Sequence, residues 1–371
     1  METRRCGCAR KVSAIVLLLI AITVLFSAPS AASSSGRGSL VVTSIDAHSA
    51  PSTISRTKSG LVASDSLTTD NLSRWHLFGD AIARNAPHLG YEDKGGLHVG
   101  IVAPEMNRWS GYFAISSLTQ AKLYHVRITL PEARPAANMV DAAFYVQQEM
   151  YKDPRIDSIG CGADIFPNVT HWAVGWGSGN ATTQNFHQTI YVDKASSQPT
   201  ARECTLGTNG DNELTAYIDG EKVFSSNTMH LNMPKPFQSY LELQTNSNAP
   251  LQARMFTGTF TDYYETTSEF LTVSDAKPGL IVRLVNGTSE SILSSSIASA
   301  NGTALLNIGK YHMPLHGSIQ VLDAKGANIL ASTDGPVASI YGGDSFSVSI
   351  PWLLTFHPSF SPCPWITSNT T

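Results

Sequence analysis

The sequence predicts an all-β protein with two successive β-sandwiches, and three observations lead to this fold class. Short apolar segments alternate with polar residues and are separated by Gly, Pro, Asn or Asp about every ten residues. Long helical patterns are nearly absent. The chain has 371 residues, more than one compact domain usually holds, and its strand rhythm breaks after Tyr264.

The first sandwich is expected over residues 72–264. Its strand candidates are rich in β-branched and aromatic residues, which suit the half-buried surface of a pleated sheet. These candidates are Leu97–Ile101, Tyr124–Ile128, Phe144–Val146, Trp172–Trp176, Thr189–Val192, Tyr240–Gln244 and Thr257–Tyr264.

The clearest local prediction is a β-hairpin between Glu213 and Phe224. The apolar residues before Asp219-Gly220 fall on one face of a strand, and this dipeptide favours a tight two-residue turn. Asn209-Gly210 marks a second turn just upstream. Residues 204–206 should therefore run antiparallel to the strand that begins at Glu213.

The segment Leu214–Phe224, with its strand ending in Asp-Gly, resembles a strand and turn of the concanavalin A-like lectin and glucanase superfamily, which includes laminin-G-like domains. The resemblance covers roughly residues 72–264, about half of the chain. It implies a jelly roll of two large antiparallel sheets, whose concave face often binds glycans.

A second, smaller β-sandwich is expected over residues 270–348, of the immunoglobulin-like or carboxypeptidase-regulatory-like type. Three alternating segments, at 280–285, 304–308 and 318–323, each precede a glycine-containing turn. The alternative is that these strands extend the sheets of the first domain. Residues 351–371 contain four prolines and predict an irregular tail.

The N-terminus has the layout of a signal peptide over residues 1–32. Basic residues precede an apolar run from Val12 to Phe26, and small residues follow at Ser30-Ala31-Ala32. The run is shorter than the ~20 residues of a typical membrane-spanning helix. The expectation is an extracellular or cell-surface protein, with a retained membrane anchor as the alternative. Residues 33–71 predict a Ser/Thr-rich linker.

Cysteine usage agrees with export. Cys6 and Cys8 lie in the leader, and Cys363 lies among prolines in the tail. Cys161 and Cys204 share a predicted domain and are the expected disulfide partners. Reduced, buried cysteines are the alternative.

The balance of charges bears on partners. Lys and Arg number 25 against 29 Asp and Glu, a formal net charge of −4. A chain with this net charge lacks the excess of basic residues that nucleic-acid binding requires, so no nucleic-acid partner is expected. A membrane partner is expected only through an uncleaved N-terminal segment. Acceptor triplets for N-glycosylation, typical of a secreted glycoprotein, begin at Asn71, Asn168, Asn180, Asn286, Asn301 and Asn369.

Known catalytic motifs are absent from the sequence. The laminarinase-like members of the superfamily carry Glu-x-Asp-x-x-Glu or Glu-x-Asp-x-Glu on one strand, and neither spacing occurs. Glu242 is therefore interpreted as the solvent side of a half-buried strand. No cofactor is expected. Calcium held by the oxygen-rich turn of Asn209, Asp211, Asn212 and Glu213 is the alternative to an ordinary hairpin turn.

Aromatic and amide side chains supply the candidate ligand-binding residues. Sugars stack on aromatic faces while amides bind their hydroxyl groups. The candidates are Trp109, Trp172, Trp176, Asn180 and Gln184. Trp172 and Trp176 are four residues apart, so on one strand they share a face. An aromatic stripe in the core is the alternative.

The sequence thus predicts an exported, non-catalytic protein that binds a glycan or another surface polymer through its first domain. Two other functions remain open. One is a glycan-cleaving enzyme with atypical carboxylate placement, and the other is a structural adhesion module.

Overall fold

The structure is a computed structural model that describes residues 52–68, 74–79, 90–93, 95–103, 108–114, 121–136, 139–148, 156–180, 183–192, 200–233, 235–245 and 254–351. The predicted signal peptide, residues 352–371 of the predicted tail, and Cys363 lie outside these ranges. The described residues form strands and turns without a helix, so none of them provides a helix that could span a membrane. The predicted all-β fold class is confirmed.

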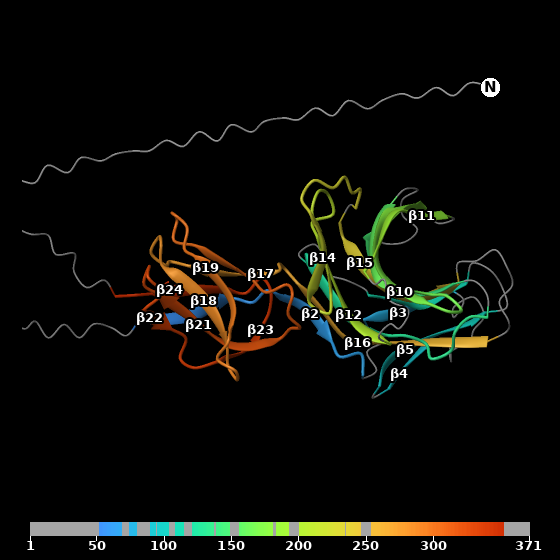
Figure 1. Ribbon diagram of the computed structural model, residues 1–371, viewed down its shortest axis with the longest axis horizontal. Helices are drawn as coiled ribbons and strands as arrows, with labels where there is room; N and C mark the ends of the chain where they lie inside the picture. The colour runs from blue at the N-terminus through green and yellow to red at the C-terminus, as the bar shows by residue number, and fades with distance from the viewer. Residues whose placement is uncertain are drawn as a thin grey trace, which may run out of the picture. The chain divides into compact units, whose positions relative to one another are not determined.

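Two antiparallel sheets form the larger sandwich (Figure 1). Seven described strands make one sheet, in the order β11 (Thr183–Tyr191), β10 (Thr170–Asn180), β9 (Ile156–Ile165), β8 (Val140–Gln148), β15 (Phe237–Thr245), β6 (Arg108–Ala114) and β3 (Trp75–Gly79). The eight-stranded sheet has the order β14 (Glu221–Ser226), β13 (Leu214–Ile218), β12 (Ala201–Thr208), β7 (Leu123–Thr129), β16 (Arg254–Thr266), β5 (Gly96–Ala103) and β4 (Gly90–Asp93), with β2 (Leu61–Asp65) beside β16.

The core of this sandwich lies between the two sheets. Alternate residues of each strand point into it, such as Phe144 and Val146 from β8 and Phe256 and Phe260 from β16. Each buried large side chain of this kind stabilises the fold by roughly 1.5 to 3 kcal/mol relative to an exposed position. The other face of each sheet is left for polar side chains.

A third sheet of nine described strands encloses a second core cluster, which also includes Leu123 of β7 and Tyr264 of β16 (Figure 1). Its order is β19 (Ile292–Ile297), β18 (Ile281–Asn286), β21 (Leu315–Leu322), β22 (Ile329–Ser332), β1 (Thr53–Lys58), β24 (Ser345–Ser349), β17 (Phe270–Ser274) and β20 (Ala304–Asn307), with β23 (Val337–Ile340) beside β21. β19 and β20, at the two ends of this order, contact each other, so the sheet curls around its core. The alternative, in which these strands extend the sheets of the first sandwich, is wrong.

The prediction of a linker over residues 33–71 is wrong for residues 53–65. β1, blue in Figure 1, lies between β22 and β24, and β2 pairs with the end of β16. The segment is rich in Ser and Thr, so its own pattern is weak. Its partner β24 begins 287 positions after Lys58, and such a pairing leaves no local signal.

The hairpin prediction is confirmed. β13 and β14 pair across Asp219 and Gly220, whose φ angles of 50° and 76° are those of a type I′ turn. β12 runs antiparallel to β13 as expected. Upstream, the side-chain oxygen of Asn209 accepts hydrogen bonds from the backbone N–H groups of residues 211, 212 and 213 at 3.0 to 3.1 Å. This turn therefore uses the Asn209 oxygen for its own backbone.

The predicted disulfide is present. Cys161 on β9 is bonded to Cys204 on β12, with their Cα atoms 5.9 Å apart. Both residues lie in the core, so the bond joins the two sheets of the larger sandwich through its interior.

Candidate functional site

Acidic, aromatic and amide side chains gather on the outer face of the seven-stranded sheet. Strand β8 alternates strictly: Val140, Ala142, Phe144 and Val146 belong to the core, so the residues between them face outward. The same alternation on β9 and β15 sends further polar residues to this face. The outward set is Asp141, Tyr145, Gln147, Asp164, Gln238, Tyr240, Glu242 and Gln244.

Strand register brings three carboxyl groups of this set together. Asp141 lies opposite Asp164 on β9 and opposite Gln244 on β15. Glu242, two positions before Gln244, is thus a diagonal neighbour of Asp141. Diagonal neighbours in an antiparallel sheet lie roughly 7 to 8 Å apart. Three adjacent strands therefore supply what no single strand of this sequence carries.

Hydrogen bonds fix the Asp141 carboxyl group. The Tyr145 hydroxyl donates to Asp141 Oδ2 at 2.5 Å, and Gln244 Nε2 donates to the same oxygen at 3.3 Å. The Tyr145 ring lies over Gly160 of β9, where a Cβ atom would approach the ring to 2.5 Å. Glycine at this position lets the tyrosine lie flat on the sheet beside Asp141.

Burial governs the protonation of this cluster. It raises the pKa of Asp141 to about 8, with a further rise from the charge of Asp164, against the lowering effect of the hydrogen bonds from Tyr145 and Gln244. Burial also raises the pKa of Glu242 to about 8, and the charge of Asp141 adds to that shift. Among the described residues, no Lys or Arg contributes to either shift.

The two groups differ in what they favour. Two donors stabilise the ionised form of Asp141, whereas Glu242 faces that negative charge and favours the protonated form. Near pH 8, where the pair holds about one proton, it can accept a proton at one carboxyl group and donate a proton from the other.

The interpretation of Glu242 as a solvent-facing residue is wrong, because its exposed fraction is only 3%. Asp141 and Asp164 were not recognised from the sequence. The available signal was a carboxylate within a strongly apolar alternation, as in Val140-Asp141-Ala142 and Ala163-Asp164-Ile165. Which strands lie side by side could not be read from that signal.

The structure places two of the aromatic candidates in the core of the larger sandwich. Trp172 and Trp176 share a face of β10, as predicted, but it is the core face. Their exposed fractions are 0% and 8%, so an open aromatic ledge formed by these two residues is wrong. The side chains of Trp109, Asn180 and Gln184 lie outside the described set.

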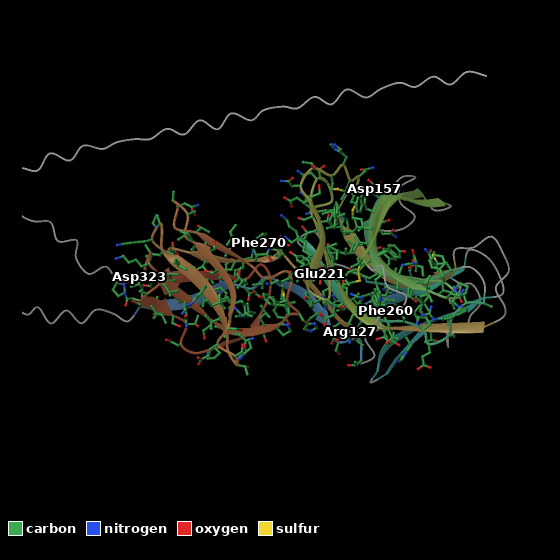
Figure 2. All side chains as sticks on the ribbon, viewed as in Figure 1. Arg127, Asp157, Glu221, Phe260, Phe270 and Asp323 are labelled. Carbon is green, nitrogen blue, oxygen red and sulfur yellow. A yellow bond between two sulfur atoms is a disulfide. The ribbon has the colours of Figure 1, made fainter. Side chains whose placement is uncertain are left out.

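Trp176 nevertheless borders a pocket of about 330 Å³ at one end of the larger sandwich. Its ring packs against Phe224 with centroids 4.6 Å apart. Asp157, labelled in Figure 2, and His230 also line the pocket. The register places Trp109 opposite Gln244, in the row that contains Asp141.

A second polar cluster lies on the outer face of the eight-stranded sheet. His125 of β7, Glu203 of β12 and His312, which follows β20, each place a potential ligand atom within 4.8 Å of the others. Of the described residues, these form the group that could hold a metal ion.

No family model matches the sequence, and no curated protein matches it. Among solved structures, the chain is similar to LamAcat from Zobellia galactanivorans, with 12% identity and a TM-score of 0.40 over 56% of this chain and 97% of that one. A pseudo β-1,3-glucanase of Mycobacterium tuberculosis gives 13% identity and a TM-score of 0.38 over 56% and 100%. The κ-carrageenase of Pseudoalteromonas carrageenovora gives 11% identity and 0.35 over 58% and 96%. These likenesses concern the fold and transfer no residue role.

Proposed function

We propose that this chain is an exported glycan-processing protein that acts through the outer face of its seven-stranded sheet. Asp141 serves as the base or nucleophile and Glu242 as the general acid. Hydrolysis of a glycosidic bond commonly needs two carboxyl groups about 5 to 9 Å apart, one protonated and one ionised. The diagonal placement of Asp141 and Glu242 on β8 and β15 is the observation that carries this proposal.

The surrounding side chains support a sugar substrate. Gln238 and Gln244, which are partly exposed, offer amides on this face beside the buried rings of Tyr145 and Tyr240. Amide side chains bind the hydroxyl groups of sugars. Uncompensated buried carboxyl groups are costly, so they concentrate where chemistry needs them.

One observation favours a second candidate, a structural module. Tyr145 and Tyr240 are 6% and 1% exposed, so this face is covered as well as polar. On that view Asp141, Tyr145 and Gln244 are a buried hydrogen-bonded network that orders the sheet.

The test compares the wild-type chain with D141N and E242Q on a neutral β-glucan, a sulfated galactan and a mucin glycan. New reducing ends and the masses of the products measure hydrolysis and transfer, and affinity electrophoresis measures binding. Each variant is expected to lose activity by roughly 100- to 10,000-fold because a proton-transfer group is removed. Bound glycan should be retained by D141N.

E221Q is the matched control, since Glu221 is an exposed carboxylate at the start of β14 (Figure 2). It should process glycans as the wild type does. Wild-type binding without turnover would support the non-catalytic alternative. If the wild type neither binds nor cleaves any of the three glycans, and D141N and E242Q are folded, the result supports the structural role.

A further inference from the structure

The His125 ring is held in one orientation. It stacks on Tyr264 with centroids 4.4 Å apart and an interplanar angle of 8°. Its Nδ1 atom lies 2.7 Å from Thr205 Oγ1. The ring is 1% exposed, so its orientation is fixed by the side chains packed around it.

The other ring nitrogen of His125 has no hydrogen-bond partner among the described residues. Nε2 is fully buried, and the described residues offer it no donor or acceptor. A buried polar atom without a partner costs roughly 1 to 3 kcal/mol. The hydrogen bond between Nδ1 and Thr205 leaves Nε2 as the atom that can bind a ligand, which is how ligating histidines are usually oriented.

Two further ligand atoms lie next to this ring. His312 Nδ1 is 3.4 Å from Glu203 Oε1, and the rings of His125 and His312 meet edge to face at 5.2 Å. The side chains of Glu203 and His312 are 25% and 43% exposed, so the cluster is open to solvent on one side.

We propose that His125, Glu203 and His312 form a binding site for a divalent transition metal, with zinc as the ion that fits best. Two imidazoles and one carboxylate suit zinc, whereas calcium and magnesium prefer oxygen ligands throughout. The solvent-facing side leaves the fourth position for water.

The spacing is compatible with tetrahedral coordination. Zinc bonds of about 2.0 to 2.1 Å place neighbouring ligand atoms about 3.3 Å apart. The His312–Glu203 pair already has this separation, and all three ligand atoms lie within 4.8 Å. Small rotations of the two partly exposed side chains would close the site around an ion.

One neighbouring charge opposes the metal. Arg127 of β7, a residue labelled in Figure 2, places its Nη1 atom 3.5 Å from Glu203 Oε1. Its side chain is 43% exposed and can turn toward solvent when a cation binds. The ion would then connect β7 and β12 of the eight-stranded sheet to the segment between β20 and β21 of the nine-stranded sheet.

The experiment measures zinc binding to the full chain at pH 7.5 by calorimetry and by equilibrium dialysis with metal analysis. A C6S/C8S/C363S background removes thiols that could bind zinc elsewhere. H312A and E203Q remove ligands. H316A is the matched control, because His316 is an exposed histidine four residues further along, outside the cluster.

The expected result is one zinc per chain in the background protein and in H316A, with affinity at least about 100-fold lower in H312A and E203Q. R127Q should bind several-fold more tightly, since the competing cation is gone. Cobalt in place of zinc should give the visible absorption of a four-coordinate ion. Equal binding by H312A and H316A, or no binding by the background protein, would overturn the proposal. The readout does not depend on glycan activity.

Discussion

At the scale of single residues, the cost of burying carboxyl groups shapes the outer face of the seven-stranded sheet. Moving a charge out of water without a partner costs several kcal/mol, so the group takes up a proton instead. Asp141 and Glu242 follow this rule, since burial is the largest cause of both raised pKa values. Hydrogen bonds from Tyr145 and Gln244 then make Asp141 the better anion of the pair.

The pH dependence of stability follows from these two groups. Their pKa values are about 8 when folded and near 4 when unfolded, so between pH 4 and 8 the folded state holds more protons. The stability that these two protonated groups contribute is therefore fully present below pH 4 and is lost as the pH rises toward 8. From pH 5 to pH 8 we expect the free energy of unfolding to fall by a few kcal/mol.

Urea unfolding of the wild type and of D141N/E242Q at both pH values measures this effect. The amides cannot ionise, so the double variant should lose clearly less stability over the same interval. Glu265, whose pKa burial raises to about 7, contributes to both proteins alike and cancels in the comparison. Parallel pH profiles for the two proteins would contradict the assignment.

At the scale of elements, the junction of β1 and β2 depends on one buried carboxylate. Asp344, which is fully buried, accepts hydrogen bonds from the backbone N–H groups of Gly60 at 2.7 Å and Tyr341 at 3.1 Å. It also pairs with Arg56 of β1 at 3.0 Å. The chain is tightly packed there, because a Cβ atom on Gly60 would lie 2.1 Å from the carbonyl oxygen of Gly342.

D344A should therefore detach the β1–β2 corner. It leaves two backbone donors and Arg56 without their partner, and the expected loss is about 2 to 4 kcal/mol of unfolding free energy. Chemical unfolding measures this, with D334A as the control, since Asp334 is exposed. A loss in D344A no larger than that in D334A would show that the corner is held by other contacts.

At the scale of the whole molecule, the Cys161–Cys204 bond joins the two sheets of the larger sandwich through its core. The cysteines are 43 positions apart. Closing a loop of that size in the unfolded chain corresponds to roughly 4 kcal/mol in the chain-entropy description.

Removing the bond should lower the unfolding free energy by about that amount. C161A/C204A and wild-type protein reduced with dithiothreitol should both show the loss in denaturant unfolding, and the variant should not respond to reductant. An unchanged midpoint after complete reduction of the wild type would contradict this prediction.

The sequence by itself determined the local features. Alternation predicted most strands of the larger sandwich, and Asp219-Gly220 predicted the hairpin. The presence of two cysteines in one predicted domain indicated the disulfide. These features depend on neighbouring residues along the chain, or on a bond that few residues can make.

The tertiary structure decided which strands lie together and which face of each is covered. Asp141 and Glu242 meet because β8 and β15 pair across about a hundred residues, and β1 finds β24 at the far end of the described chain. Alternation places residues on two faces of a strand but does not say which face becomes the core, and for that reason Trp172 and Trp176 are buried in the core.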